Sequence, residues 1–597
     1  MRGKIFVWCF IILVIVNSNF VNSQEDTITP FFSITLLAPN TGSAPPWVYF
    51  DDYIAPEIEK IGIDVNCVCT MLGYITPRVW NYPGPYPIPK YSEGGYDIFL
   101  GSYSWICEWN PKGLFETTAI TPNGDNYYQF SNPEMDLIIS NLNNSINEQE
   151  KSDLLKDAQE ILYNELPVIP IVEPAMMYIH NENLSGQNFF LWSTSQQSMY
   201  NWSLSDQNIL RFAIEYDEFN FYPSIHYNYY YYNVGIKNQI YPGLMERNLK
   251  TKYCSSNLLI NNISTLDGLT YSITINSDIL WADGTPFTIE DIIYNYQLAV
   301  TPYDLNYLYD EACQYWDNNS VVKLSDTDFS FTFKKKQLFQ ERFFTLPLLP
   351  KHIWEFVAPE NHYQAATNWS QNFPEKIFGC GPYKLGEYNE TQITLVKNDF
   401  YEFIRGNNAN FNEIHFKNYY NYYYAQREVL DAFEENEIDI ILPEFFESGF
   451  TIYDGRNFTN SIVPSGGLWE IGINMYHPYL GTGESCPIAG EESAKHIRRA
   501  INFIIPRDEI ILDLYNGYAL PGITSCPSTS FGFDNSLTPI PNSYLLALEE
   551  MVAAGFDVEN ILHASTSFVG LSFVEYLILL ALVGGNFILI TFKSKKY

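Results

Sequence analysis

The sequence contains none of the short motifs that mark common catalytic sites. It has no G-x-S-x-G nucleophile elbow, no H-E-x-x-H zinc motif and no G-x-x-x-x-G-K-[ST] phosphate-binding loop. The eight histidines are scattered, and no two have the spacing of metal ligands on one helix. Carboxylates are plentiful, so residue types alone leave a paired-acid site open. We therefore predict a protein that is not an enzyme, with no catalytic residues, no metal site and no cofactor.

Charge and cysteine content limit the class of protein further. Acidic residues outnumber basic ones by 69 to 33, for a formal net charge of −36. This balance argues against a nucleic-acid partner, whose phosphates need basic residues, and favours a soluble acidic surface. Eight of the nine cysteines follow the first 23 residues, which permits disulfides outside the cell without fixing their pairing. Eight sequons allow N-glycosylation, at Asn143, Asn183, Asn201, Asn262, Asn318, Asn368, Asn389 and Asn457.

Hydrophobic segments stand at the two ends of the chain. Residues 1–23 combine a basic start, a short apolar core and small residues before position 24, which is typical of a secretory signal peptide; an uncleaved N-terminal anchor is the alternative. Residues 572–592 are long and apolar enough to cross a bilayer, and a lysine-rich tail follows at once. We predict a cell-surface protein of the plasma membrane with one C-terminal transmembrane helix, its large domain outside and its C-terminus in the cytoplasm.

Between these ends, short apolar strands alternate with amphipathic helices, which indicates an α/β protein. Thr288 and Asp291 have the spacing of a helix-capping pair, and apolar residues at 292, 293, 296 and 300 then form one helix face. Tyrosine is frequent, with 46 residues, and suits either a ligand cleft or ordinary packing. We expect helices at 48–61 and 146–166, and strands at 34–37, 63–68, 96–100 and 168–172.

Residues 280–291 read L-W-A-D-G-T-P-F-T-I-E-D, which predicts a strand end, a tight turn and a helix start. This stretch resembles the family 5 extracellular solute-binding proteins, the oligopeptide and dipeptide receptors of ABC importers. Pro506 stands where the family has an aspartate, at a helix start that tolerates proline. Further family-like segments follow in the family's order, at 349–354, 379–385, 395–401, 437–440, 497–511 and 551–556.

The segments that come last in this family stand first in this chain. The C-terminal part of the family's sequence is resembled by residues 57–65, 95–98, 105–111, 132–136 and 166–171 of this chain. The start of the family's sequence is resembled by residues 209–213 and 240–244. We interpret the chain as circularly permuted, and two truncated copies in tandem are the alternative. The interpretation predicts that strand 34–37 shares a lobe with helix 497–505. It also predicts that strand 210–213 pairs beside strand 168–172.

The resemblance implies a two-lobed periplasmic-binding-protein fold of type II with an extra subdomain. Lobes of this type close on a ligand at their hinge. The expected division is 1–23 signal peptide, 31–165 first part of lobe two, 166–245 lobe one core, 246–374 lobe one subdomain, 375–468 lobe one core, 469–566 second part of lobe two and 572–592 transmembrane anchor.

The same resemblance points to a ligand site near residue 108. The family's W-x-A-D-Y segment corresponds to residues 105–109, and its aspartate pairs with the α-amine of a peptide in peptide-binding relatives. Glu108 stands in its place, with the same charge and a reach one methylene longer. Trp105 and Trp109 flank it as apolar or cation–π walls, and Tyr103 completes the predicted ligand-binding set. The alternative is a surface glutamate beside two core tryptophans.

We therefore predict an extracellular, membrane-anchored receptor that acts as a monomer. It captures an oligopeptide or another small solute for the permease subunits of an ABC importer, as the resemblance implies. The importer's motor must be a separate chain, because the sequence has no phosphate-binding loop. A surface hydrolase, or an adhesion or surface-layer protein on the same scaffold, is the alternative. Turnover of peptides or sugars would favour the hydrolase, and a site that binds no solute would favour the adhesion protein.

Overall fold

The structure is a computed structural model that describes residues 29–40, 46–105, 108–187, 195–205, 207–216, 219–223, 231–248, 251–256, 258–303, 306, 308–401, 409–419, 425–442, 458–559 and 561. The predicted signal peptide at 1–23 and the predicted membrane span at 572–592 lie outside these residues. None of the helices within them is both long and apolar enough to cross a bilayer. Cys107 is also outside them, and among the described cysteines Cys313, Cys380, Cys486 and Cys526 are free thiols.

The chain forms two compact units, each built from segments that are distant in the sequence. Of the described residues, the smaller unit contains those within 1–100, 472–506 and 540–597, and the larger one contains those within 101–471 and 507–539. The chain passes between them four times, within the strands β3 (Ile98–Ser104) and β17 (Gly467–Ile473) and after residues 506 and 539. Both units mix helices with strands, which confirms the α/β class predicted from the sequence.

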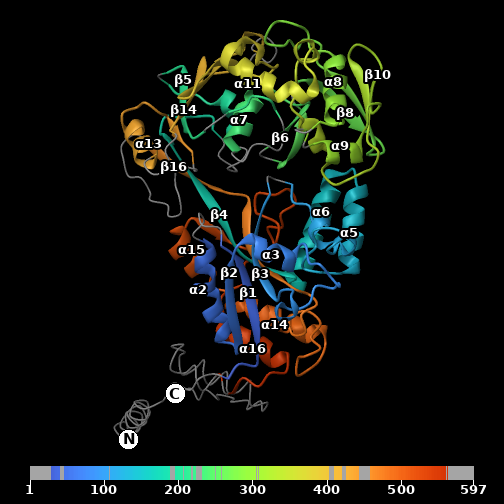
Figure 1. Ribbon diagram of the computed structural model, residues 1–597, viewed down its shortest axis with the longest axis vertical. Coiled ribbons are helices and arrows are strands. Elements are labelled where there is room, and N and C mark those ends of the chain that lie inside the picture. Colours follow the sequence, from blue (N-terminus) through green and yellow to red (C-terminus); the bar gives the residue numbers. More distant parts are fainter. Residues whose placement is uncertain are drawn as a thin grey trace, which may run out of the picture. The chain divides into compact units, whose positions relative to one another are not determined.

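The smaller unit is built on a parallel sheet (Figure 1). β1 (Phe32–Pro39) pairs with β2 (Ile63–Thr70) along its whole length and with the start of β3 on its other side. These strands are close to those predicted at 34–37 and 63–68. α2 (Pro46–Glu59) connects β1 to β2, and Gly62 follows it with a φ of +84°, a conformation that glycine adopts without strain. α3 (Leu72–Val79) and the short 3-10 helix η1 (Tyr91–Glu93) complete the N-terminal part.

Residues from the C-terminal half complete the smaller unit. α14 (Glu491–Ile504) buries Ile497, Ile501 and Ile504 on one face, and it packs against α16 (Tyr544–Ala553). The Phe32 ring stacks on Tyr479 with a centroid distance of 4.1 Å. β1 and α14 therefore share one compact unit, as the permuted order predicts.

The larger unit is organised around β4 (Val168–Asn181) and β5 (Ile209–Ile214). The strands follow the order β12 (Tyr383–Tyr388), β13 (Gln392–Lys397), β14 (Glu413–Asn418), β5, β15 (Ile440–Ile441) and β4. β5 runs parallel to both of its neighbours, whereas β4 is antiparallel to β15, β16 (Phe458–Pro464) and β18 (Ala519–Pro521). The expectation that β5 pairs directly beside β4 is wrong, because β15 lies between them.

A four-stranded antiparallel sheet forms a separate layer of the larger unit. Its order is β10 (Val321–Lys323), β11 (Asp328–Thr332), β9 (Thr270–Ile275) and β8 (Ile260–Thr265). α8 (Ile289–Ala299) packs near it, and the Asp291 carboxylate accepts hydrogen bonds from the backbone and the hydroxyl of Thr288, both at 2.9 Å. The predicted capping pair is confirmed. A two-stranded hairpin, β6 (Met245–Asn248) with β7 (Tyr253–Ser256), stands apart from both sheets.

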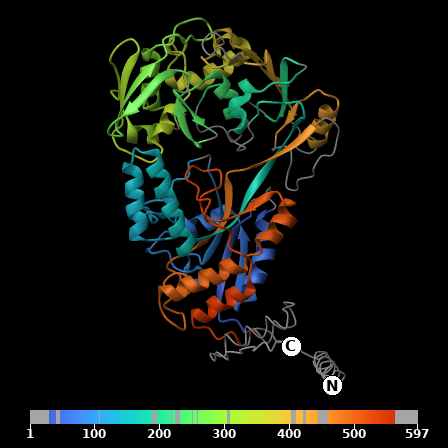
Figure 2. The same ribbon diagram turned by 180° about the vertical axis from the view of Figure 1, so that it is seen from behind.

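Helices surround these strands. α5 (Pro133–Asn144) and α6 (Glu148–Glu165) lie side by side (Figure 2). Residues 101–165 and 507–539, which the resemblance assigns to lobe two, belong to the larger unit. The remaining helices are α4 (Lys112–Phe115), η2 (Thr117–Ala119), η3 (Ser195–Asn201), α7 (Tyr231–Ile240), α9 (Tyr309–Tyr315), η4 (Gln340–Thr345), α10 (Lys351–Trp354), η5 (Pro359–Asn361), α11 (His362–Asn372), η6 (Pro374–Lys376), α13 (Ala425–Glu434) and α15 (Arg507–Tyr515).

Candidate functional site

The four predicted ligand-binding residues lie at and after the end of β3. Tyr103 and Trp105 are both half-buried, and their rings lie nearly parallel with centroids 6.4 Å apart. The Trp105 backbone N–H donates to the carbonyl of Gly466 at 2.9 Å, which ties this segment to the start of β17. Trp109 is fully buried, and its indole N–H has no hydrogen-bond partner among the described residues. The structure thus brings Tyr103 and Trp105 together and places Trp109 in the interior.

Glu108 forms an ion pair with Arg247, a residue that was not predicted from the sequence. The guanidinium of Arg247, on β6, donates from Nε to Oε1 at 3.2 Å and from Nη2 to Oε2 at 3.4 Å. The Glu108 side chain is only 11% exposed and that of Arg247 21%. The Cys254 thiol, opposite Arg247 in the β6–β7 ladder, lies 3.9 Å from Oε1. Glu108 is therefore a mostly buried, ion-paired carboxylate, unlike the surface glutamate of the alternative reading.

A fully buried acid lies among the aromatic residues near Tyr103. The Tyr128 hydroxyl donates to Glu470, on β17, and the Tyr128 ring stacks on Phe115 with a centroid distance of 5.3 Å. Burial raises the pKa of Glu470 to about 7. Burial also raises the pKa of Tyr128, and the nearby phenol of Tyr103 adds to this shift. Tyr103, which was predicted from the sequence, is therefore near the Tyr128–Glu470 pair, which was not predicted.

Glu173 is a second buried carboxylate in the larger unit. It lies on β4 and is 4% exposed. Its Oε2 accepts a hydrogen bond from the backbone N–H of Ser528 at 3.1 Å, and its Oε1 has no partner in the described residues. Lys252, in the turn of the β6–β7 hairpin, donates to the carbonyl of Ser528 at 2.6 Å. Burial raises the pKa of Glu173, and the charge of Lys252 partly opposes this.

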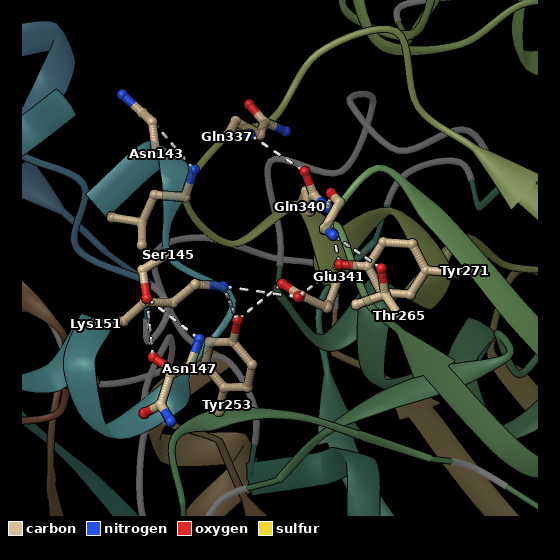
Figure 3. A network of polar contacts seen from close by, with 12 residues as sticks. Asn143, Ser145, Asn147, Lys151, Tyr253, Thr265, Tyr271, Gln337, Gln340 and Glu341 are labelled. Atoms are coloured by element: carbon tan, nitrogen blue, oxygen red, sulfur yellow. Dashed lines mark hydrogen bonds and ion pairs between the residues drawn. The ribbon is translucent and has the colours of Figure 1, made fainter. Parts of the chain in front are cut away.

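A polar network fixes the hairpin that carries these cations (Figure 3). Lys151, on α6, donates to the Tyr253 hydroxyl at 2.9 Å and lies 3.7 Å from a carboxylate oxygen of Glu341. Tyr253 and Tyr271 each donate to Glu341, at 2.8 and 2.9 Å. The side chain of Lys151 is 4% exposed, so the network is largely shielded from water. It joins α6, β7, β9 and η4, and this restrains the β6–β7 hairpin.

The arrangement is suited to holding a charged or polar solute. Glu108 pairs directly with Arg247 of the β6–β7 hairpin. Glu173 is linked to Lys252 of the same hairpin through Ser528, whose backbone contacts both side chains. Tyr103, Trp105 and Trp109 are close to Glu108 in the sequence, and aromatic residues are common in small-molecule sites. Within the described part of the chain, no group of three or more metal-ligating side chains comes together.

Comparison with known proteins establishes the class to which this chain belongs. The family model described as "Bacterial extracellular solute-binding proteins, family 5 Middle" matches residues 240–572, more than half of the chain. The chain belongs to the family 5 bacterial extracellular solute-binding proteins, which confirms the resemblance found in its sequence motifs.

Individual relatives match shorter stretches. The chain is 26% identical over 206 residues to a probable peptide-binding protein, YejA, of Agrobacterium fabrum, which covers 34% of this chain and 32% of that protein. It is 28% identical over 174 residues to the oligopeptide-binding protein AppA of Bacillus subtilis, covering 28% and 30%. The glutathione-binding protein GsiB of Salmonella typhimurium is 32% identical over 97 residues, or 16% and 19%. The chain thus spans at most about a third of these relatives' lengths.

Solved structures also match in part. AppA of Bacillus subtilis in complex with a nonapeptide is 21% identical, covering 39% of this chain and 44% of that one, with a TM-score of 0.33. NikZ of Campylobacter jejuni in complex with Ni(L-His) is 18% identical, covering 39% and 42%, with a TM-score of 0.32.

Proposed function

We propose that this chain is an extracellular solute receptor that captures peptides or similar small solutes and delivers them to the permease of an ABC importer. Family membership supports this proposal, and so do the names of three relatives, which describe binding of peptides, oligopeptides and glutathione. These names describe binding proteins, which favours a receptor over the hydrolase alternative.

The proposed ligand-binding residue is Glu108. By its sequence resemblance Glu108 corresponds to the family's amine-pairing acid, and it is a largely buried carboxylate that follows Tyr103 and Trp105 in the chain. An ionised carboxylate has about four lone-pair positions, so the two bonds from Arg247 leave room for a ligand ammonium. A ligand amine at this place forms a charge-assisted hydrogen bond in a mostly desolvated environment.

The proposal is tested by identifying what the protein carries when it is purified. Full-length protein from its native host is denatured, and the released small molecules are identified by mass spectrometry. A peptide or another amine-bearing solute at a molar ratio near one to the protein supports the proposal. Protein that releases no solute, and whose melting temperature does not respond to peptide mixtures, contradicts it and favours the adhesion alternative.

The membrane topology belongs to the same proposal. We infer cleavage near Ser23, a single span at 572–592 and an exported domain between them. The sequon residues Asn183, Asn201, Asn262, Asn318, Asn368 and Asn389 are exposed, as glycan attachment requires. Deleting residues 568–597 is expected to release a folded protein into the medium. Aggregation of that truncated chain, with a full chain that is soluble without detergent, would contradict the anchor.

The permuted order is also a proposal, supported by the place of β1 and α14 in one compact unit. A chain in which residues 24–205 are moved behind residue 566 restores the family order. This rearranged chain is expected to fold and to bind the same solute as the parent. If it fails to fold while the parent folds, two truncated tandem copies become the better interpretation.

A further inference from the structure

Glu173 is a carboxylate in a place where the fold would otherwise take an apolar side chain. Residues 168–173 of β4 are all buried. Glu173 follows the run 168–172, which consists of valine and isoleucine apart from Pro170. An ionised carboxylate in such surroundings is costly unless a cation or several hydrogen-bond donors compensate it. Its presence therefore calls for a partner.

The described residues supply only part of that partnership. Oε2 accepts a hydrogen bond from the backbone N–H of Ser528, and the Ser528 side chain also acts on the carboxylate, whereas Oε1 has no hydrogen-bond partner among the described residues. The Lys252 ammonium acts on Glu173 through space but donates to a backbone carbonyl, and the two side chains form no ion pair. The Thr529 hydroxyl, on the same loop and 2% exposed, has no hydrogen-bond partner either. Buried polar atoms in native proteins nearly always have partners, so these two oxygens are suited to a group that the described residues do not provide.

Glu173 and Glu108 are connected to the same hairpin. Arg247 pairs with Glu108 from β6, and Lys252 holds the Ser528 loop from the adjacent turn. Both carboxylates therefore have a cationic residue of the same hairpin as a neighbour. The net charge of −36 also favours a cationic solute, because the field of the protein attracts it.

We propose that Glu173 is a second recognition carboxylate, which takes a cationic nitrogen of the bound solute, so that the receptor selects peptides with a basic side chain. This inference rests on the proposed function, and it adds the class of peptide. The Thr529 hydroxyl serves as a further acceptor for the same nitrogen.

Binding of matched peptides to the full-length protein tests this selectivity. The probes are three tripeptides with lysine at the first, second or third position among alanines, each compared with its norleucine counterpart, which has the same stem without the charge. At least one lysine peptide is expected to bind about tenfold or more tightly than its counterpart, as a hydrogen bond to a desolvated charge provides. Isothermal titration calorimetry measures both affinities.

The Glu173→Gln variant separates recognition from structure. Glutamine keeps an acceptor for the Ser528 N–H and removes the charge. The lysine preference should disappear, while affinity for the norleucine peptide stays within about twofold of the parent. Glu290→Gln, which alters a surface ion pair with Lys323, is the matched control and should keep the preference. Equal affinities for every pair in the parent, or a preference that survives Glu173→Gln, would overturn the inference and leave the receptor function standing. Failure of all six peptides to bind the parent would contradict the proposed function, and the inference with it.

Discussion

Glu470 makes the stability of this protein depend on pH, and the direction of that dependence follows from its burial. The side chain is 1% exposed, with the Tyr128 hydroxyl as a hydrogen-bond donor. Burial raises its pKa to about 7, from an ordinary value of 4.5. Between these values the folded protein holds a proton that the unfolded chain has lost. The free energy of unfolding therefore falls as pH rises through this range.

The size of the effect follows from the difference between the two pKa values. That difference is about 2.5, and each pKa unit corresponds to about 1.4 kcal/mol, so ionising Glu470 in the folded protein costs about 3–4 kcal/mol. Most of this, about 2–3 kcal/mol, falls between pH 5 and pH 8. Glu470→Gln removes the titrating group and keeps an acceptor for the Tyr128 hydroxyl.

Urea unfolding followed by tryptophan fluorescence at pH 5 and pH 8 measures the effect. The parent protein should lose about 2–3 kcal/mol more than Glu470→Gln over this interval. Glu434→Gln, at an exposed position on α13, is the control and should behave as the parent does. If the parent and Glu470→Gln show the same difference between the two pH values, Glu470 is not the buried, proton-holding acid that the structure indicates.

Three further substitutions test the packing around the site. Lys151→Met leaves Glu341 without its cation and should lower the free energy of unfolding by about 3–5 kcal/mol in urea titrations. The double variant Lys151→Met/Glu341→Gln should recover part of that stability. An unchanged urea midpoint for Lys151→Met would contradict the network. Burial lowers the pKa of Lys237 to about 7, below its ordinary 10.5, so the parent should gain stability as pH rises from 7 to 10, and Lys237→Met should abolish that gain. A Cβ at Gly243 would lie 2.6 Å from the backbone of Thr345, so Gly243→Ala should cost about 1–3 kcal/mol in thermal unfolding, whereas Gly73→Ala, with open space around it, should cost little.

Local elements of this fold are readable from the sequence because local physics determines them. The cap at Thr288 depends only on Asp291, three residues away, and the buried stripe of α14 depends on its helical period. The placement of β15 between β5 and β4 is different. That strand has only two residues, and its position depends on pairing with segments more than 200 residues away. Its apolar pattern identifies a buried strand but not its neighbours.

The site shows the same division. The resemblance drew attention to Glu108, but its partner Arg247 is 139 residues away and reaches it only through the hairpin register. Glu173 did leave a signal, as a lone carboxylate at the end of an apolar run. The sequence cannot say which loop meets it, because Ser528 is 355 residues further along the chain. Long-range pairs of this kind depend on the whole fold and not on local pattern.

Calorimetry of the full-length protein with one peptide and its N-acetylated twin tests the central claim most directly. The two ligands differ only in the charged amine that Glu108 is proposed to bind. We predict that the parent binds the free-amine peptide at least about 30-fold more tightly, as breaking one partner of a charge-assisted buried pair requires. Glu108→Gln should reduce that affinity to the level of the acetylated peptide, with Glu290→Gln as the unaffected control. Equal binding of the two peptides by the parent, or an unchanged affinity in Glu108→Gln, would contradict the assignment of Glu108 as the residue that recognises the peptide amine.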